Sequence, residues 1–461
     1  MDAAVKLEEQ LQETPSKKKH PPGLKLLFFT EMWERFSYYG MRGLLFLYLT
    51  ASFISGGLGF DEATASMIYG FYTGAVYFSP LVGGWLTDHY IGKRLAITLG
   101  GVTMAAGNIV LFALHSQLGL YLGLSLLIIG NGFFKPNIST LLGDLYGEND
   151  PRRDSAFTIF YMGINLGAFF APIVAGFLAE DFFKTTINGV EHFGFNYGFL
   201  AAAIGMIIGQ ISFNLLGNRY LGDIGKKPNA KKTAENPKAN APLTKKEKQR
   251  TWAIIIITSF VVFFWAGFEQ AGTSLTAYTR DFVDRSIFGW EIPTSWFQAV
   301  NPFFIIILAP LVAMLWSRLA RSKRGDLPVP IKMGLGMILL GSGFIVLMTA
   351  VMQTGSDPEN IVVKANLLFV VFTYMLHTIG ELFLSPIGLS LVSRIAPVKL
   401  ASLLMGVWLA SSGIANIIAG QIAALTATLG FLEIFAAIGG IAIFIGLLLI
   451  SVNRVLVRMM D

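Results

Sequence analysis

The stretch EMWERFSYYGMRG, residues 31–43, decides the fold of this chain because it places charges at the start of an apolar run. On a helix, four of its side chains share one face, since their spacings are four, three and four residues: Glu31, Arg35, Tyr38 and Arg42. A charge that faces lipid is energetically costly. We therefore predict a membrane helix whose charged face points into a helix bundle or into water.

Two explanations fit this charged face. One is a structural ion pair between Glu31 and Arg35 that holds the start of the helix. The other is a site that titrates, because Glu34 lies beside the same face and two carboxylates near two guanidiniums exceed the needs of one pair. The number of charges favours the titrating site.

The composition of the whole chain is that of a membrane protein. Of the 461 residues, 54% are hydrophobic and 14% are charged, whereas a soluble domain carries about 25% charged residues. Cysteine is absent and the five histidines do not pair at a metal-ligand spacing, so we predict no metal site and no cofactor. The net charge of +6 comes from short basic clusters between apolar runs, which indicates membrane topology and not nucleic-acid binding.

Twelve apolar runs are long enough to cross a bilayer, which takes about 20 residues. They cover residues 24–55, 66–89, 94–114, 118–142, 156–179 and 196–217, and then residues 251–280, 295–317, 331–353, 362–393, 400–425 and 430–453. The polar linker between the sixth and seventh runs has no apolar periodicity. We predict an all-α membrane protein with a tail (1–22), an N-terminal six-helix bundle (23–217), a linker (218–250) and a C-terminal six-helix bundle (251–461).

The distribution of basic residues predicts the orientation. If the N-terminus is inside, about 26 of the 35 Lys and Arg fall in the tails and inside loops. About four fall outside: Lys184, Arg280, Arg285 and Lys364. The first residues also lack the short apolar core of a cleaved signal peptide. Both termini and the linker are therefore predicted to be cytoplasmic.

The loop after the second run, GGWLTDHYIGKR (residues 83–94), is similar to a signature of the major facilitator superfamily, Gly-x-x-x-Asp followed by Gly-x-Arg/Lys. A basic loop after a helix-ending aspartate is the simpler explanation of the same residues. Twelve runs and a central linker favour the superfamily. That resemblance implies that Asp88, Lys93 and Arg94 form a cytoplasmic latch between the second and third helices. It also implies two bundles around a central cavity, with alternating access.

Three further charges lie within apolar runs: Lys135, Glu269 and Glu381. Each is costly in the membrane. Two interpretations fit them: buried structural pairs, or charged groups of a cavity. In the second, a Lys135–Glu381 bridge between the two halves would be made or broken as the halves move. His377 precedes Glu381 by four residues on the same face, which fits a proton relay or, more simply, a core residue.

Together, several motifs of the chain resemble those of the proton-dependent oligopeptide transporter family. EMWERFSYYG resembles the family's E-x-x-E-R-F-x-Y-Y-G signature, and FTIFYMGINLG (157–167) resembles its F-Y-x-x-I-N-x-G signature. Further segments with the family's pattern are GNGFFKPN (130–137), SWFQAVNP (295–302), GELFLSPIGLS (380–390) and MGVWLASSG (405–413). The chain departs from many bacterial members in one respect, since its linker is polar and holds no extra pair of helices.

The resemblance implies a role for each matching residue. Proton coupling falls to Glu31, Glu34, Arg35 and Glu269, the last of which is also linked to closure of the extracellular side. The cations Arg35 and Lys135 would receive the carboxylate of a peptide. The remaining substrate-binding residues would be Glu381, Asn165 and Asn301 at the amino end and backbone, and Tyr38, Tyr39, Tyr77, Trp296 and Trp408 as walls or gates.

The sequence thus predicts a proton-coupled symporter that imports di- and tripeptides across the cytoplasmic inner membrane. A transporter of the same fold for nitrate or a peptide-like drug is the alternative. An enzyme is disfavoured, because no nucleophile with a base, metal cluster or phosphate-binding loop is evident. Peptides, protons and the lipid bilayer are the expected partners, with no nucleic acid, and we expect a functional monomer.

Overall fold

The structure, a computed structural model, describes residues 19–147, 150–228, 243–323, 325–355, 361 and 363–460, without the side chains of Leu389, Val398 and Ser402. Six long helices occupy the first half: α2 (Pro22–Thr50), α3 (Glu62–Leu86), α4 (Lys93–Ala113), α5 (Gln117–Asp144), α6 (Arg153–Phe177) and α7 (Phe195–Leu221). Six more follow: α8 (Lys245–Phe268), α10 (Val300–Ala320), α11 (Val329–Thr354), α12 (Leu368–Ile395), α13 (Ala401–Ala424) and α15 (Phe431–Ser451).

Short elements connect these helices. The helical ones are η1 (Thr87–Ile91), η2 (Leu178–Phe182), η5 (Glu269–Gly272), α9 (Ser274–Phe282), η6 (Thr294–Ala299), η8 (Val398–Leu400), α14 (Thr426–Leu429) and α16 (Asn453–Met460). Strands β1 (Thr185–Ile187) and β2 (Val190–His192) form one antiparallel hairpin, and β4 (Ser286–Ile287) and β5 (Trp290–Glu291) form another. Strands β3 (Val283–Asp284) and β6 (Ala365–Asn366) pair in parallel.

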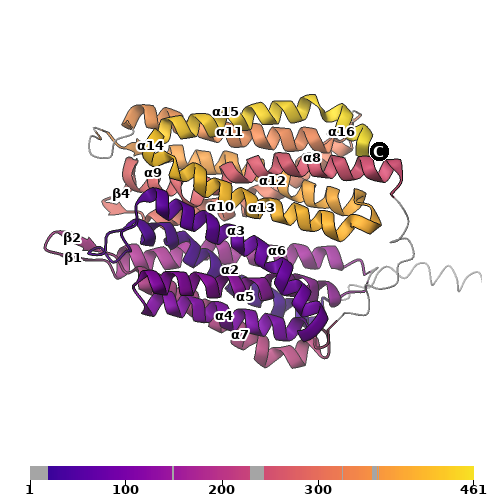
Figure 1. Ribbon diagram of the computed structural model, residues 1–461, viewed down its shortest axis with the longest axis horizontal. Coiled ribbons are helices and arrows are strands. Elements are labelled where there is room, and N and C mark those ends of the chain that lie inside the picture. The colour runs from indigo at the N-terminus through magenta and orange to yellow at the C-terminus, as the bar shows by residue number, and fades with distance from the viewer. Residues whose placement is uncertain are drawn as a thin grey trace, which may run out of the picture.

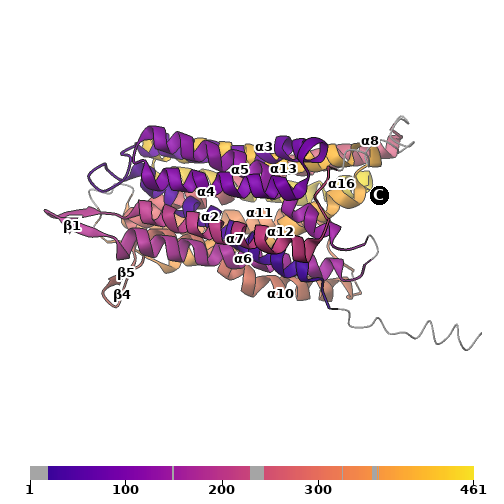
Figure 2. The same ribbon diagram turned by 90° about the horizontal axis from the view of Figure 1, so that it is seen from below.

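The helices gather into two groups that follow the chain. Helices α2 to α7, in indigo to magenta, lie together, and α8 to α15, in rose to yellow, lie beside them (Figure 1). We name these groups the N-terminal and C-terminal bundles. The hairpins lie at one end of the molecule, and Met460 and α16 lie at the other (Figures 1 and 2). We name the hairpin end the outer end, because the expected outside loops contain both hairpins.

Ten helical segments of the described residues are long and apolar enough to cross a membrane. Helices α2 and α3 are not among them. Helix α2 carries Glu31, Glu34, Arg35 and Arg42, while α3 is rich in Gly, Ser and Tyr, so both lack the mean hydropathy of a lipid-facing span. Both exceptions belong to the predicted cavity wall, where polar residues are tolerated if they face protein or water.

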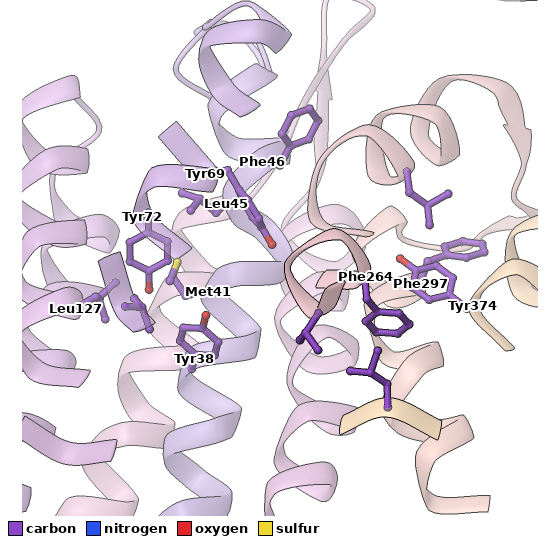
Figure 3. Close-up of a cluster of buried hydrophobic side chains, with 14 of the residues drawn as sticks. Tyr38, Met41, Leu45, Phe46, Tyr69, Tyr72, Leu127, Phe264, Phe297 and Tyr374 are labelled. Carbon is purple, nitrogen blue, oxygen red and sulfur yellow. The ribbon is translucent and has the colours of Figure 1, made fainter. Parts of the chain in front are cut away.

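Small residues bring the two bundles into close contact between α3 and α13. A Cβ added at Gly70 would lie 2.7 Å from the Cα of Gly420, and one at Gly74 would lie 2.9 Å from the carbonyl oxygen of Gly413. Only glycine permits this approach, as is usual where membrane helices cross closely. Buried aromatic side chains fill the remaining space, with Tyr38, Tyr69 and Tyr72 on the N-terminal side and Phe264, Phe297 and Tyr374 on the C-terminal side (Figure 3).

Candidate functional site

The charged face of α2 is buried, as the sequence predicts. Arg35 binds Glu34 through two nitrogens: Nε contacts Oε2, and Nη2 donates to Oε1 at 2.7 Å. Arg35 Nε also lies 3.2 Å from Glu31 Oε1, and the other oxygen of Glu31 is buried without a hydrogen-bond partner. One guanidinium therefore serves two carboxylates, and a change in either carboxylate alters what the other receives.

A second arginine of α2 joins the two bundles. Arg42 forms an ion pair with Glu269, the first residue of η5, and donates from Nε to the hydroxyl of Tyr69 at 2.7 Å. Both members of the ion pair are largely buried, with 11% and 6% of their side chains exposed. The seventh predicted apolar run (251–280) does not form one continuous helix. Helix α8 ends at Phe268, and η5 leads to α9 through the non-helical Thr273 (φ −132°, ψ −95°). The break places Glu269 at the bundle boundary.

A partly buried carboxylate of the C-terminal bundle, Glu381, is held by an amide from a neighbouring helix. Asn301 on α10 donates from Nδ2 to Glu381 Oε2 at 2.9 Å and to Thr378 Oγ1 at 3.0 Å. Both Thr378 and Glu381 lie on α12. The bond to Asn301 fixes one oxygen of the carboxylate and orients the group.

A cavity of about 220 Å³ lies between the bundles and unites many of the predicted residues. The predicted residues in its wall are Tyr39, Tyr77, Asn165, Glu269, Asn301 and Glu381. Arg42 also lines it, which gives the cavity a cation from the N-terminal bundle and two carboxylates from the C-terminal bundle. Asn165 donates a hydrogen bond from its amide nitrogen to the carbonyl oxygen of Tyr161 at 2.9 Å. Its amide oxygen is therefore the atom that would contact a ligand.

The predicted bridge between Lys135 and Glu381 is not formed in this structure. Among the described residues, no ion pair joins the two, and Lys135 Nζ instead lies 4.4 Å from the ring centroid of Tyr77. The ion pair that joins the two bundles at the cavity is instead Arg42–Glu269. The face of the Tyr77 ring attracts the Lys135 ammonium electrostatically, so the lysine has a favourable contact without a carboxylate. The bridge stays a prediction for another state of the molecule.

Three predicted aromatic residues do not line the cavity. Tyr38 is buried in the N-terminal bundle, with the guanidinium of Arg35 5.3 Å from its ring centroid. Trp296 lies in η6 and donates from its indole to the carbonyl of Ile173 at 3.0 Å. Trp408 is buried against Gly388, where an added Cβ would lie 2.1 Å from the indole ring. Their roles as walls or gates stay predictions, and this structure shows them as packing residues.

The loop motif makes different contacts from those expected. Lys93 Nζ donates to Asp144 Oδ2 at 2.5 Å, and Arg94 donates to the carbonyl of Gly222 at 2.9 Å and to Asn218 Oδ1 at 3.0 Å. Asp88 is exposed. In this structure the two basic residues tie α4 to α5 and to the end of α7, and the expected contact with Asp88 is absent from the described residues.

Several cavity residues escaped the reasoning from sequence. Tyr161, Tyr374 and Gln298 line the cavity, and Tyr69 binds Arg42 just beside it. Their signal is a polar group within an apolar run, which a tyrosine or glutamine shares with many packing residues. His377 also lines the cavity, with its ring 4.8 Å from that of Phe344, and its assignment as proton relay or core residue stays a prediction.

Comparison with protein families decides the family. The sequence profile of the POT family matches residues 94–235 and 231–439. The chain belongs to the POT family. Its similarity to other POT-like proteins extends over nearly its whole length, so the motifs found in the sequence are part of one continuous resemblance.

Two relatives illustrate the range of similarity. The "Uncharacterized transporter YclF" of Bacillus subtilis is 35% identical over 99% of this chain and 99% of its own. The "Di-/tripeptide transporter" of Lactococcus lactis subsp. cremoris is 30% identical over 95% of this chain and 96% of its own.

A solved structure of a "peptide transporter POT" variant in complex with alafosfalin superimposes with a TM-score of 0.85, at 33% identity and with 96% of both chains covered. The POT fold therefore extends over both bundles of this chain.

Proposed function

We propose that this POT protein is a proton-coupled symporter that imports di- and tripeptides by alternating access. The observation that carries the proposal is the cavity between the bundles, which has Arg42 on one side and Glu269 and Glu381 on the other. We propose that twelve helices span the membrane, six in each bundle, and that both termini are cytoplasmic. The charges of the cavity wall then lie near the middle of the membrane, where fixed charges mark a solute pathway.

The chemistry of a short peptide matches these charges. A di- or tripeptide is a zwitterion whose two charged ends lose water when it enters a small cavity. Fixed charges of opposite sign can replace that water, with an arginine or lysine at the carboxylate and a carboxylate at the amino group. Because side chains vary, we expect recognition to rest on the two ends, with tyrosines such as Tyr39, Tyr77 and Tyr161 around the rest.

Each predicted residue has a proposed role. Arg35 and Lys135 receive the peptide carboxylate, and Glu381, with Asn301 and Asn165, receives the amino end. We propose that Lys135 leaves the ring of Tyr77 and pairs with Glu381 when the bundles close around the cavity.

The arrangement around Arg35 offers a route to proton coupling. Arg35 is occupied by Glu34 and Glu31 in this structure. Protonation of one of these carboxylates weakens its bond to the guanidinium and frees Arg35 for a peptide carboxylate. The proton and the peptide then each raise the affinity for the other, as reciprocal linkage requires. We propose that Glu269 adds a second coupling point, since its protonation would release Arg42 and the contact between the bundles.

The names of two relatives support this proposal. A 30% identical protein is a di-/tripeptide transporter, and a 32% identical protein from Yersinia enterocolitica is the peptide transporter YePEPT. We extend their solute class to this chain. We also propose that it resides in the cytoplasmic inner membrane, in contact with lipid on all sides, and works as a monomer.

Uptake into liposomes tests the proposal. Purified protein is reconstituted, an inward proton gradient is imposed, and uptake of labelled dialanine is followed with excess unlabelled tripeptide or nitrate outside. We expect uptake that depends on the gradient and that tripeptide blocks while nitrate does not. No uptake, or uptake blocked only by nitrate, would leave the fold intact and assign the chain to the alternative solute class.

A further inference from the structure

A carboxylate at the outer end of the N-terminal bundle reaches across to the C-terminal bundle. Glu180 lies in η2, directly after α6. Its Oε2 accepts a hydrogen bond from the backbone N–H of Thr294 at 2.7 Å, and its Oε1 accepts one from Ser295 at 3.0 Å. Both donors open η6, where the first N–H groups of a helix have no partner within the helix. One side chain therefore caps a helix of the opposite bundle through both oxygens.

The residues around these hydrogen bonds pack α6 closely against η6. Thr294 and Ser295 are buried, and a Cβ added at Gly176 on α6 would lie 1.9 Å from the hydroxyl oxygen of Ser295. Trp296 of η6 also donates its indole N–H to a carbonyl of α6. Hydrogen bonds between a carboxylate and backbone amides are stronger than those between neutral groups. Separation of α6 from η6 must break both bonds.

The element that Glu180 holds is connected to the centre of the molecule. η6 continues into α10, which carries Asn301 of the cavity. In the same element, Gln298 donates from Nε2 to the carbonyl oxygen of Ala271 at 2.5 Å and to Thr276 Oγ1 at 3.0 Å. Ala271 belongs to η5, two residues beyond Glu269. A shift of η6 is therefore transmitted to the broken helix that provides the Arg42–Glu269 ion pair.

We propose that Glu180 is a positioning residue for transport: it holds η6 against the N-terminal bundle and must release Thr294 and Ser295 before the cavity opens outward. The inference rests on the proposed alternating access and is independent of which solute is carried. It is also distinct from the other contacts between the bundles. Arg42–Glu269 and Arg280–Glu62 join side chains of α2 and α3 to η5 and α9, whereas Glu180 binds the backbone of η6.

Distances between spin labels test the proposal directly, because the chain has no cysteine of its own. Leu118→Cys on α5 and Leu429→Cys on α14 provide exposed positions at the outer ends of the two bundles. Ser155→Cys and Ser322→Cys provide exposed positions at the opposite end. The full-length protein is labelled in liposomes, and the ratio of long to short outer distances is measured by pulsed electron paramagnetic resonance.

Two substitutions at Glu180 weaken its pair of hydrogen bonds to Thr294 and Ser295, which we name the clasp, to different degrees. Glu180→Gln keeps the size of the side chain but leaves one acceptor oxygen and no charge, and Glu180→Ala leaves neither. We expect the ratio of open to closed outer distances to rise about tenfold in Glu180→Ala, and less in Glu180→Gln, because bonds to a charged acceptor are lost. The distances at the opposite end should shorten in the same samples.

A matched control comes from the same surface. Glu191 on β2, like Glu180, lines an outer cavity of about 650 Å³, but its partner is Lys184, which directly precedes β1 of the same hairpin, at 2.9 Å. Glu191→Gln therefore removes the same charge from the same cavity without removing the hydrogen bonds to η6, and it should keep the parental distances. Equal shifts in Glu191→Gln and Glu180→Gln would overturn the proposal, since surface charge alone would then explain them.

A second variant tests the contact from the other bundle. Thr294→Pro removes one donor, and a proline fits the first position of a helix and follows the extended Pro293 (ψ 135°) without a clash. It should open the outer end as Glu180→Gln does, and the combined variant should add little to either change.

Parental distances in both Glu180 variants would overturn the clasp. Dialanine uptake by the parent, measured in the same liposomes, tests the peptide proposal separately, because the distances need no solute.

Discussion

Arg42 on α2 and Glu269 at the start of η5 form a buried ion pair that joins the N-terminal and C-terminal bundles beside the central cavity. The pair lies where the seventh long helix is broken, so its formation and the shape of that helix depend on each other. A buried ion pair is costly to break by removing one partner, because the remaining charge stays without compensation.

Glu269→Gln should loosen the contact between the bundles and reduce gradient-driven dialanine uptake by more than tenfold. The physical reason is the uncompensated guanidinium of Arg42, for which removal of one partner costs about 3–5 kcal/mol in buried pairs. Glu291→Gln is the control, since its pair with Arg285 is half exposed on the Glu291 side and such pairs contribute about 0–1 kcal/mol. Parental uptake in Glu269→Gln would contradict the prediction.

Glu34→Gln should abolish uptake driven by a proton gradient while leaving exchange of peptide for peptide. Glu34 binds Arg35 through both oxygens, and a neutral amide cannot take up and release a proton there. Exchange needs peptide binding but no net proton movement. Uptake under a gradient and counterflow without one are measured in the same liposomes, and an equal loss of both would assign Glu34 to folding or binding instead.

Asn301→Ala should weaken dipeptide binding about tenfold, because Glu381 loses the hydrogen bond that orients it and a bond to a charged group contributes about 1.5–3 kcal/mol. Titration of purified protein with dialanine measures the affinity. Thr378→Val is the matched control, as it removes the other acceptor of Asn301 and leaves the bond to Glu381 in place. If both variants bind as the parent does, Glu381 is not held for the substrate by Asn301.

Tyr77→Phe should retain dipeptide binding, whereas Tyr77→Leu should weaken it and Lys135→Ala should weaken both binding and uptake. The ring of Tyr77 lies 4.4 Å from Lys135 Nζ, and a cation near an aromatic face gains about 0.5–2 kcal/mol that an aliphatic side chain does not provide. Equilibrium binding of dialanine to the three variants gives the comparison. Equal affinities in Phe and Leu variants would show that the ring does not position the lysine.

Asp61 should make the stability of the outer end depend on pH. It caps α3 by accepting a hydrogen bond from the N–H of Thr64 at 2.9 Å, and this bond lowers the pKa of the Asp61 carboxyl. A pKa below that of the unfolded chain means that the stabilisation is present above an unfolded pKa of about 3.9 and is lost as the pH falls through the folded value.

Asp61→Asn keeps a capping oxygen without the charge, so we expect a smaller drop in thermal midpoint on acidification in detergent. An unchanged drop would indicate that other carboxylates govern it.

The sequence by itself determined the class of protein and the position of each long helix in the described part of the chain. Each of the twelve predicted runs overlaps one long helical segment of the structure, because runs of apolar residues have few other ways to satisfy their backbone in a membrane. The EMWERFSYYG motif was also sufficient to predict that charges on α2 are buried. Periodicity carries this information, since residues at spacings of three and four share a helix face whatever the neighbouring helices do.

Only the tertiary structure decided which charges meet. Lys135 and Glu381 have opposite charges and lie in opposite bundles, yet Lys135 rests on Tyr77 while Arg42 provides the ion pair between the bundles. Glu180 offers no sequence signal at all, because its partners are two backbone amides that any residue except proline could supply. Contacts between bundles depend on how two rigid groups of helices are placed, and residues more than a hundred positions apart carry no local pattern that records that placement.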